Sequence, residues 1–293
     1  METVIDQSSL GLKAVHTLGL WFGESMWRTL RQRRHMAIQA IRHHLELPEE
    51  EAASLARESF RHTGQAFLEL FTARAVDHRF VQARVAFSDA DNFSRLLKTD
   101  RPVVAATGHL GAWELMAGIS RLFFQDRRSQ IIVKQPINPV FRFALTSLRG
   151  IGSNEIVNKD NAAPTVLRCL LRDKGISAFL VDHNAKRSKA VFLPFLNELA
   201  SVNAGPAVLA VRAKALIWPI FLLRNSPGQY LLHSLPPLDT TSLTGTMQDR
   251  IEAAAKFYTQ AVEETVRRNP EQWFWMHKRW RTRPLWEKNS PKS

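Results

Sequence analysis

The pattern of hydrophobic and polar positions changes near residue 100. Residues 8–75 are predicted to be helical, because apolar side chains recur there at mixed three- and four-residue spacings. From Arg42 to Ala73 these positions are Leu45, Leu47, Leu55, Phe60, Phe67, Leu68 and Phe71. Pro48 followed by three glutamates is typical of a helix start, where acidic groups meet the positive end of the helix dipole. We therefore expect residues 1–100 to form a helical N-terminal segment.

After residue 100, short runs typical of buried strands alternate with helical stretches. The predicted strands cover 102–107, 131–134, 155–157, 176–181, 217–223 and 230–235. The predicted helices cover the stretch up to 124 and residues 139–148, 163–172, 206–213 and 246–268. This alternation predicts an α/β fold, a central mixed sheet flanked by helices. We expect residues 101–293 to form this core and the N-terminal segment to pack on it as part of one structural domain.

Composition limits the classes of protein. Of 293 residues, 45% are hydrophobic and 23% charged, which excludes a disordered chain, a collagen-like fibre and a polytopic membrane protein. The net charge of +13 predicts an anionic partner: nucleic acid, an acidic protein or an anionic membrane. The single cysteine, Cys169, cannot form an internal disulfide, and its apolar neighbours predict a buried, inert thiol.

The N-terminus contains an apolar stretch that polar residues interrupt. Between residues 10 and 27 it is broken by Lys13, His16 and Glu24, and an arginine cluster follows it. This pattern fits neither a secretory signal nor a membrane-spanning helix. Two interpretations carry equal weight: a helix lying in an anionic membrane interface, or an amphipathic helix packed on the domain with its basic end solvated. We expect a cytosolic chain that attaches to the membrane without crossing it.

A histidine and a carboxylate follow the first core strand. His109 comes directly after residues 102–107, and Glu114 lies five positions further on, near the start of the next helix. Ligands gather at the carboxyl ends of strands in such sheets. The imidazole can accept a proton from a substrate hydroxyl while Glu114 fixes its tautomer, and Gly108 and Gly111 allow a substrate to approach the backbone. The alternative, of similar weight on spacing alone, is a histidine that caps a helix.

Other kinds of chemistry find no support in the sequence. It contains no G-x-S-x-G elbow, no P-loop, no G-x-G-x-x-G after a strand and no paired His or Cys at zinc-binding spacing. We therefore predict no metal site. Since no nucleophile is apparent, a base that acts on the hydroxyl of the substrate is the simplest scheme.

Polar and basic residues also follow the strand at 176–181. Asp182 and His183 end that strand, and a basic loop with Lys186, Arg187 and Lys189 comes next. An anionic ligand could bind there, although a loop of solvated charges has the same pattern.

Five segments in a fixed order resemble one family. They are Gly108-His109-(x)4-Glu114, the Asp182-His-Asn strand end, Val191-Phe-Leu-Pro-Phe195, Gly205-Pro-Ala, and Gln272-Trp-Phe-Trp-Met-His277-Lys-Arg-Trp280 with Arg283-Pro284. Together they are similar to the bacterial lipid A biosynthesis (late, secondary) acyltransferases of the lysophospholipid acyltransferase superfamily, over about residues 15–285. The resemblance implies a glycerolipid acyltransferase-like fold.

The resemblance also implies an activity and a place of action. It implies transfer of a fatty acyl chain from acyl carrier protein, or from acyl-CoA, to a hydroxyl of a membrane glycolipid such as a lipid A precursor. No cofactor is implied beyond that acyl donor, and the reaction would take place at the cytoplasmic face of the inner membrane. The implied partners are acyl carrier protein, anionic membrane lipid and the glycolipid acceptor.

Residue roles follow from the matching positions. His109 is the implied base, Glu114 its partner, and Asp182 matches a functionally important aspartate. Where part of the family has an arginine after the third strand, this chain has Lys159, which we expect to supply that charge. The predicted substrate-binding residues are Gly108, Lys159, Asp182, His183, Lys186, Arg187 and Lys189.

Three alternatives stay open at this point: an acyltransferase for another membrane lipid, a catalytically idle protein of the same fold, and a basic nucleic-acid-binding protein. No nucleic-acid-binding motif supports the last, and basic residues are spread along the chain. We therefore expect no nucleic acid partner.

Overall fold

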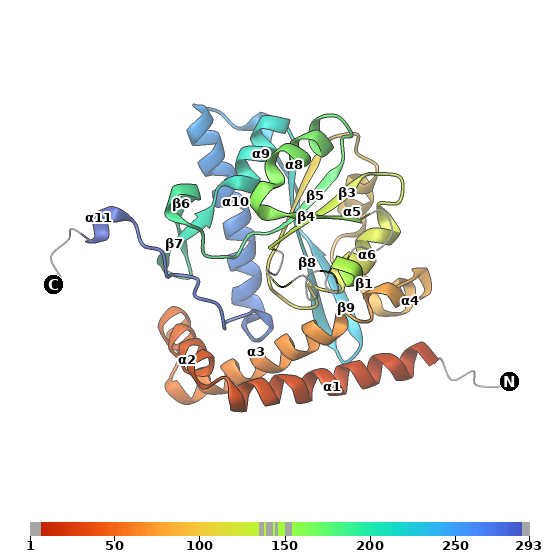
Figure 1. Ribbon diagram of the computed structural model, residues 1–293, viewed down its shortest axis with the longest axis vertical. Helices are drawn as coiled ribbons and strands as arrows, with labels where there is room; N and C mark the ends of the chain where they lie inside the picture. Colours follow the sequence, from red (N-terminus) through yellow and green to blue (C-terminus); the bar gives the residue numbers. More distant parts are fainter. Residues whose placement is uncertain (1–6, 135–137, 139–142, 144–145, 150–153, 289–293) are drawn as a thin grey trace.

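The computed structural model describes residues 7–134, 138, 143, 146–149 and 154–288. Its centre is a twisted sheet with strand order β1-β9-β8-β2-β5-β3-β4, with β10 paired to β8 (Figure 1). The strands along this path are β1 (Val85–Phe87), β9 (Gln229–Ser234), β8 (Leu216–Ser226), β2 (Val103–Thr107), β5 (Ile176–Leu180), β3 (Ser129–Val133) and β4 (Asn154–Asn158). The short β10 covers Leu238–Asp239. β8 runs antiparallel to β9 and β10, and the other neighbours are parallel. The predicted α/β fold with a mixed sheet is confirmed.

Helices cover both faces of this sheet. One face packs against α5 (Ala90–Leu97) and α6 (Met116–Phe123), and the other against α8 (Ala162–Leu171), α9 (Gly205–Ala213) and α10 (Met247–Arg268). Each face has its own hydrophobic core. In β2, Val103 and Ala105 belong to the core under α5 and α6, whereas Val104 and Ala106 belong to the larger core under α8, α9 and α10. Because both faces are buried, this strand is a continuous apolar run without polar alternation.

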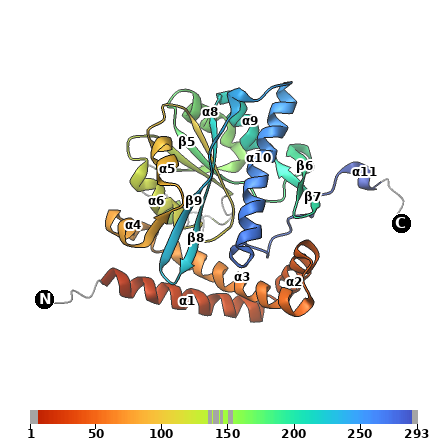
Figure 2. The same cartoon turned by 180° about the vertical axis from the view of Figure 1, so that it is seen from behind.

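The N-terminal segment forms three helices beneath the sheet: α1 (Gln7–Thr29), α2 (Arg31–Leu45) and α3 (Glu49–Glu69). In both views α1 and α3 lie side by side (Figures 1 and 2). Glycines allow this close contact: a Cβ at Gly64 would come within 2.4 Å of the backbone nitrogen of Gly23. Phe60 of α3 and Ile41 of α2 are buried in the larger of the two cores.

The outer face of α1 carries exposed apolar side chains. Leu18, Trp21 and Phe22 are 59%, 70% and 43% exposed. Among the described residues, no helix has the length and hydropathy needed to cross a bilayer. The structure confirms that α1 packs on the domain on one side. Its exposed apolar side chains leave the membrane-interface interpretation as a prediction.

A hairpin stands apart from the main sheet. It consists of β6 (Ala190–Phe195) and β7 (Glu198–Asn203), joined by Leu196 and Asn197. The sequence pattern did not predict these strands, since Pro194 interrupts a run that otherwise has strand character. It also missed β1 and the helices α4 (His78–Arg84) and α5 as separate elements. Most of the predicted helix at 139–148 falls outside the described residues.

The C-terminal aromatic segment is packed inside the protein. Trp273, Trp275 and Arg279 are at most 1% exposed, and Arg279 donates to the backbone carbonyl of Ser201 at 2.6 Å. Only beyond it, at α11 (Leu285–Lys288), does a tryptophan, Trp286, become exposed.

Candidate active site

His109 and Asp182 meet at the carboxyl edge of the sheet. His109 follows β2 and Asp182 follows β5, and these two strands are parallel neighbours, with Thr107 opposite Leu180. The ends of the two strands therefore lie together, and the Nδ1 of His109 is 2.9 Å from Oδ1 of Asp182.

The Asp182 carboxylate is completely buried and fully bonded. Its side chain has no exposed surface. Its Oδ2 accepts the backbone N–H of His109 at 2.8 Å and the indole N–H of Trp273 at 2.9 Å. Burial alone would raise the pKa of Asp182, but the charge and hydrogen bond of His109 outweigh it, so this pKa lies well below the ordinary value.

This geometry decides which nitrogen of His109 can act. A carboxylate only accepts hydrogen bonds, so Nδ1 carries the hydrogen and the lone pair is on Nε2. The ring is 20% exposed and lines the pocket described below. An imidazole fixed in this tautomer can accept a proton from a group in that pocket.

The predicted pairing of Glu114 with His109 is wrong. Glu114 instead binds Arg149, whose Nε and Nη2 donate to its two carboxylate oxygens at 2.9 and 2.5 Å. The reason is local: α6 begins only at Met116, and bridges from Leu110 to Trp273 and from Gly111 to Leu222 hold the preceding residues out of a helix. A spacing of five therefore does not bring the two side chains together.

Arg149 is a site residue that the sequence analysis missed. It directly follows the predicted helix at 139–148 and carries no motif of its own. Burial lowers and the hydrogen bond with Glu114 raises the pKa of Arg149, with a net rise. Both side chains line the pocket, where they present a paired charge to its interior.

Two further predictions for the substrate-binding residues need correction. Asp182 cannot touch a substrate, since it is buried behind His109. The space at Gly108 is used by the protein, because a Cβ there would come within 3.2 Å of Oδ2 of Asp182. Gly111 has a φ of +62°, and its backbone packs closely against the carbonyl of Leu222. Glycine is therefore needed here for contact within the protein.

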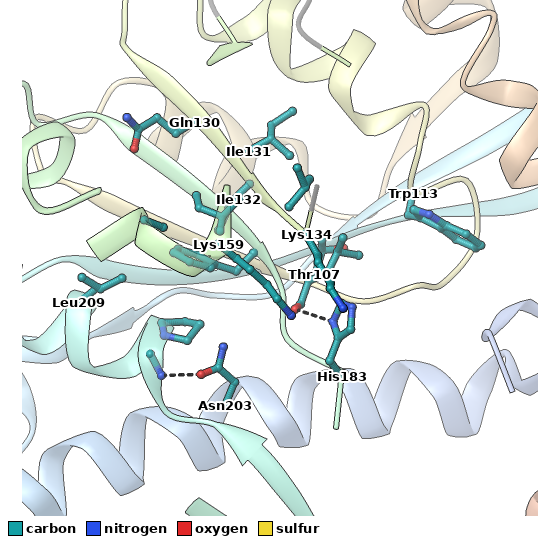
Figure 3. A pocket seen from close by; sticks show the side chains of 18 of the residues that line it. Thr107, Trp113, Gln130, Ile131, Ile132, Lys134, Lys159, His183, Asn203 and Leu209 are labelled. Carbon is teal, nitrogen blue, oxygen red and sulfur yellow. Dashed lines mark hydrogen bonds between the residues drawn. The ribbon is translucent and has the colours of Figure 1, made fainter. Parts of the chain in front are cut away.

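A large pocket opens in front of His109, with a volume of about 1080 Å³. Its wall is mainly apolar and includes Ala105, Ile132, Phe179, Trp218 and Leu209. Figure 3 shows Ile131, Ile132 and Gln130 at one end and His183 at the other. The volume and the apolar lining suit a long apolar group whose reactive end lies beside His109.

Lysines gather at the histidine end of the pocket. Lys159, Lys186 and Lys189 line the pocket, together with Lys134, which the sequence analysis did not single out. Figure 3 shows Lys134 and Lys159 near His183. Partial burial and then the charge of Lys134 lower the pKa of Lys159. This mutual repulsion makes the cluster a good site for an anion.

Arg187 does not belong to this cluster. It is absent from the pocket wall, and its Nε and Nη2 donate to the backbone carbonyl of Arg283 at 3.2 and 3.0 Å. The prediction that it holds substrate with its lysine neighbours is therefore wrong: it binds the C-terminal segment.

His183 lies beside the His109–Asp182 pair, with its ring centre 4.6 Å from that of His109. Desolvation and then the nearby His109 lower the pKa of His183 to about 4, so its ring is neutral near pH 7. Ligand atoms of His109, Asp182 and His183 lie within 4.8 Å of one another, a spacing that could also hold a metal ion. In this structure both oxygens of Asp182 accept hydrogen bonds, and the bond from Nδ1 of His109 orients the imidazole.

The fold and the site define an α/β protein in which a buried aspartate orients a histidine on the wall of a large, mainly apolar pocket. Residues 9–282 match the family described as bacterial lipid A biosynthesis acyltransferase. The chain belongs to this family and is thereby an acyltransferase.

Individual relatives are distant. The chain is similar to lipid A biosynthesis lauroyltransferase of Escherichia coli K12, 33% identical over 105 residues, 35% of this chain and about a third (33%) of the relative. It is 25% identical to the palmitoleoyltransferase of the same strain over 81% of this chain and 75% of the relative. It is also 25% identical to phosphatidylinositol mannoside acyltransferase of Mycolicibacterium smegmatis, over 70% and 68% of the two chains.

Proposed function

We propose that this protein transfers a fatty acyl chain from an acyl thioester to a hydroxyl of a membrane glycolipid, with His109 as general base. The observation that carries the proposal is that Asp182 holds Nδ1 of His109, while the same ring lines a large, mainly apolar pocket and has no bond to Nε2 among the described residues. The names of the relatives support a lipid A precursor or a related glycolipid as acceptor.

The proposed reaction balances without a protein nucleophile. Nε2 of His109 accepts the proton of the acceptor hydroxyl as its oxygen attacks the thioester carbonyl. The tetrahedral intermediate then collapses, the C–S bond breaks, and the imidazolium returns the proton to the departing thiolate. Asp182 stabilises the imidazolium and holds its orientation throughout.

The lysine cluster supports an anionic donor. Acyl carrier protein and coenzyme A both present their thioester on a phosphopantetheine arm. Lys134, Lys159, Lys186 and Lys189 line the pocket and would bind its phosphate. The net charge of +13 also favours acidic carrier protein and anionic lipid.

We propose that the protein attaches from one side to the cytoplasmic face of the inner membrane, and the exposed apolar face of α1 supports attachment to a membrane surface. Trp21 and Phe22 would enter the interface, and the arginines after α1 would meet anionic headgroups. High salt and a Trp21→Ser/Phe22→Ser variant should each reduce sedimentation with vesicles of anionic lipid, since salt screens charges beyond about 8 Å at physiological strength. Retention after both treatments would contradict peripheral attachment.

Lipid analysis tests the proposed function. Mass spectrometry of total lipids from a deletion strain should reveal a glycolipid lighter by one acyl group, and its identity separates a lipid A precursor from another acceptor. Expression of the wild-type chain should restore it, and a folded His109→Ala variant should not. Full restoration by His109→Ala would exclude His109 as the base and make His183 the next candidate.

A further inference from the structure

Two histidines and a glutamate meet away from the pocket. His43 and His44 lie in the last turn of α2, and Glu198 begins β7 of the hairpin, above α2 in Figure 1. Nε2 of His43 and Nε2 of His44 lie 3.3 and 3.7 Å from the same atom, Oε2 of Glu198. None of the three lines the pocket. We propose that His43, His44 and Glu198 bind a zinc ion.

The spacing of the ligand atoms matches a tetrahedral ion. Zinc bonds of about 2.0–2.2 Å to nitrogen and oxygen place neighbouring ligand atoms roughly 3.3 Å apart. The two nitrogen–oxygen distances are close to this value, and all three ligand atoms lie within 4.8 Å of one another. The His44 distance is too long for a hydrogen bond. An ion between the groups accounts for two side chains that converge on one oxygen.

The tautomer of His44 is fixed for metal binding. Its Nδ1 lies 3.0 Å from the backbone carbonyl of Leu196, and a carbonyl can only accept, so Nδ1 carries the hydrogen. In the neutral ring the lone pair is then on Nε2, 3.7 Å from Oε2 of Glu198. A lone pair and a carboxylate oxygen this close repel unless a proton or a metal ion lies between them. A ligating histidine that donates its other N–H to a carbonyl is the usual arrangement in metal sites.

Other neighbours hold the ligands in place. His44 is buried and stacks on Trp280, with ring centres 3.5 Å apart. Arg283 donates to Oε1 of Glu198 at 2.5 Å, which leaves Oε2 for the ion and fixes the plane of the carboxylate. Such hydrogen bonds to ligating carboxylates are common around metals.

The hairpin turn brings the two sides together. Leu196 and Asn197 have φ values of 50° and 66°, the left-handed conformation of a two-residue hairpin turn. This turn puts the Leu196 carbonyl and the Glu198 side chain on either side of His44. An ion here would fasten α2, part of the N-terminal helical segment, to the hairpin of the catalytic core.

The ligand types select the metal. Two imidazoles and one carboxylate suit Zn²⁺, with water as the fourth ligand, whereas Mg²⁺ and Ca²⁺ prefer oxygen alone. The His109, Asp182 and His183 group is a separate potential metal site, so the test needs variants that distinguish the two.

The test uses the full chain, free of any tag and treated with EDTA, then dialysed and titrated with ZnCl₂ by calorimetry. We expect one saturable site that His43→Ala and Glu198→Gln each weaken at least about tenfold, comparable to the effects known for altered metal sites. The side chain of His43 is 71% exposed, so its loss leaves the fold intact. His35→Ala, a change of an exposed histidine on the same helix, is the matched control and should bind as the wild type does.

Thermal unfolding gives a second measurement. Zinc should raise the melting temperature of wild type and His35→Ala, but not that of His43→Ala, and MgCl₂ should have no effect on any of them. Absence of a saturable site would overturn the proposal, as would equal affinity of wild type and His43→Ala. Loss of binding on His183→Ala alone would assign the ion to the other cluster and overturn it as well.

Discussion

Two carboxylates near His109 differ in every property that matters for chemistry. Glu114 is five residues away in sequence, lines the pocket and pairs with Arg149. Asp182 is 73 residues away, has no exposed surface and receives the imidazole N–H. The parallel pairing of β2 with β5 brings Asp182 to the histidine, while an irregular segment before α6 directs Glu114 elsewhere. The partner of a base is set here by sheet topology, not by local spacing.

The difference also separates two tasks. Asp182 holds a charge that water cannot screen, so it can stabilise the imidazolium and fix its tautomer. The Glu114–Arg149 pair faces the pocket, where it can contact a substrate or shape the wall. A carboxylate engaged by an arginine fork is a poor acceptor for an imidazole N–H as well.

The largest effect tests this division directly. Asp182→Asn should lower kcat by about 10²–10⁴-fold, because the neutral amide no longer stabilises the imidazolium. Its NH₂ group would also face the N–H groups that now bind the carboxylate. Glu114→Gln should cost less, since it keeps the shape of the pocket wall and leaves the His109–Asp182 pair in place. Steady-state thiol release from acyl donor measures both variants.

The comparison fails if the order is reversed. A folded Glu114→Gln variant that loses more kcat than Asp182→Asn would return Glu114 to the role of partner for His109. Circular dichroism and a melting curve for each variant keep loss of fold apart from loss of catalysis.

Much of the fold could be predicted from the sequence. The alternation of apolar runs with helical stretches marks the core strands and helices from β2 to α10, since buried parallel strands are short and continuously apolar. The hairpin could not be predicted in the same way. Pro194 disfavours a ladder strand, and only pairing with β7, a tertiary feature, permits β6.

The site was predictable in its residues but not in their pairing. His109, Asp182 and Lys159 stand at the carboxyl ends of strands, where the α/β rule places ligands and chemistry. Which carboxylate meets the imidazole depends on strand order, and neither spacing nor composition encodes that order. Arg149 carries no local motif, and it acts through its bond to Glu114. Trp273 lies in one of the five segments of the resemblance, but its bond to Asp182 is a tertiary contact that the segment alone does not reveal.

Trp273 offers a finer test of the buried carboxylate. Trp273→Phe keeps an aromatic ring but removes the N–H that reaches Oδ2 of Asp182 at 2.9 Å. We expect kcat to fall about tenfold, the equivalent of about 1.4 kcal/mol, with KM unchanged, because the carboxylate is then held less firmly and orients the imidazole less well. With one donor fewer, Asp182 should attract the imidazolium more strongly, and the acidic limb of the kcat/KM profile should move to higher pH.

A neighbouring tryptophan supplies the matched control. Trp275 is equally buried, but its indole N–H donates to the carbonyl of Pro270 at 2.8 Å. Trp275→Phe should therefore leave the pH profile in place. If both variants shift it alike, the effect is one of packing and Trp273 has no positioning role.

Acid unfolding tests whether Asp182 is held ionised in the folded protein. Its pKa in the folded protein lies well below the ordinary value of 3.8, because the interaction with His109 outweighs burial. Below that value the unfolded chain takes up a proton at this position and the folded chain does not. Stability contributed by Asp182 is therefore present above about pH 4 and is lost as the pH falls, by at most about 1.4 kcal/mol per pH unit. Urea unfolding at pH 2.5–4.5 should show a shallower dependence for Asp182→Asn than for wild type. Equal slopes would mean that this carboxylate is not held ionised.

The smallest expected effect concerns the lysine charges that line the pocket. Lys159, Lys186 and Lys189 line the pocket and are exposed, so each contributes only a modest attraction to an anionic donor, about 0.2–1 kcal/mol. Changing all three to Gln should raise the KM for the donor roughly five- to tenfold with kcat nearly unchanged, since the lost attraction acts equally on ground and transition states. Added salt should raise the KM of the wild type toward the value of the variant. Arg187→Gln is the control within the same loop, because that guanidinium binds the Arg283 carbonyl, and its KM should stay at the wild-type value. An equal rise in KM for Arg187→Gln would show that net charge, and not the pocket cluster, attracts the donor.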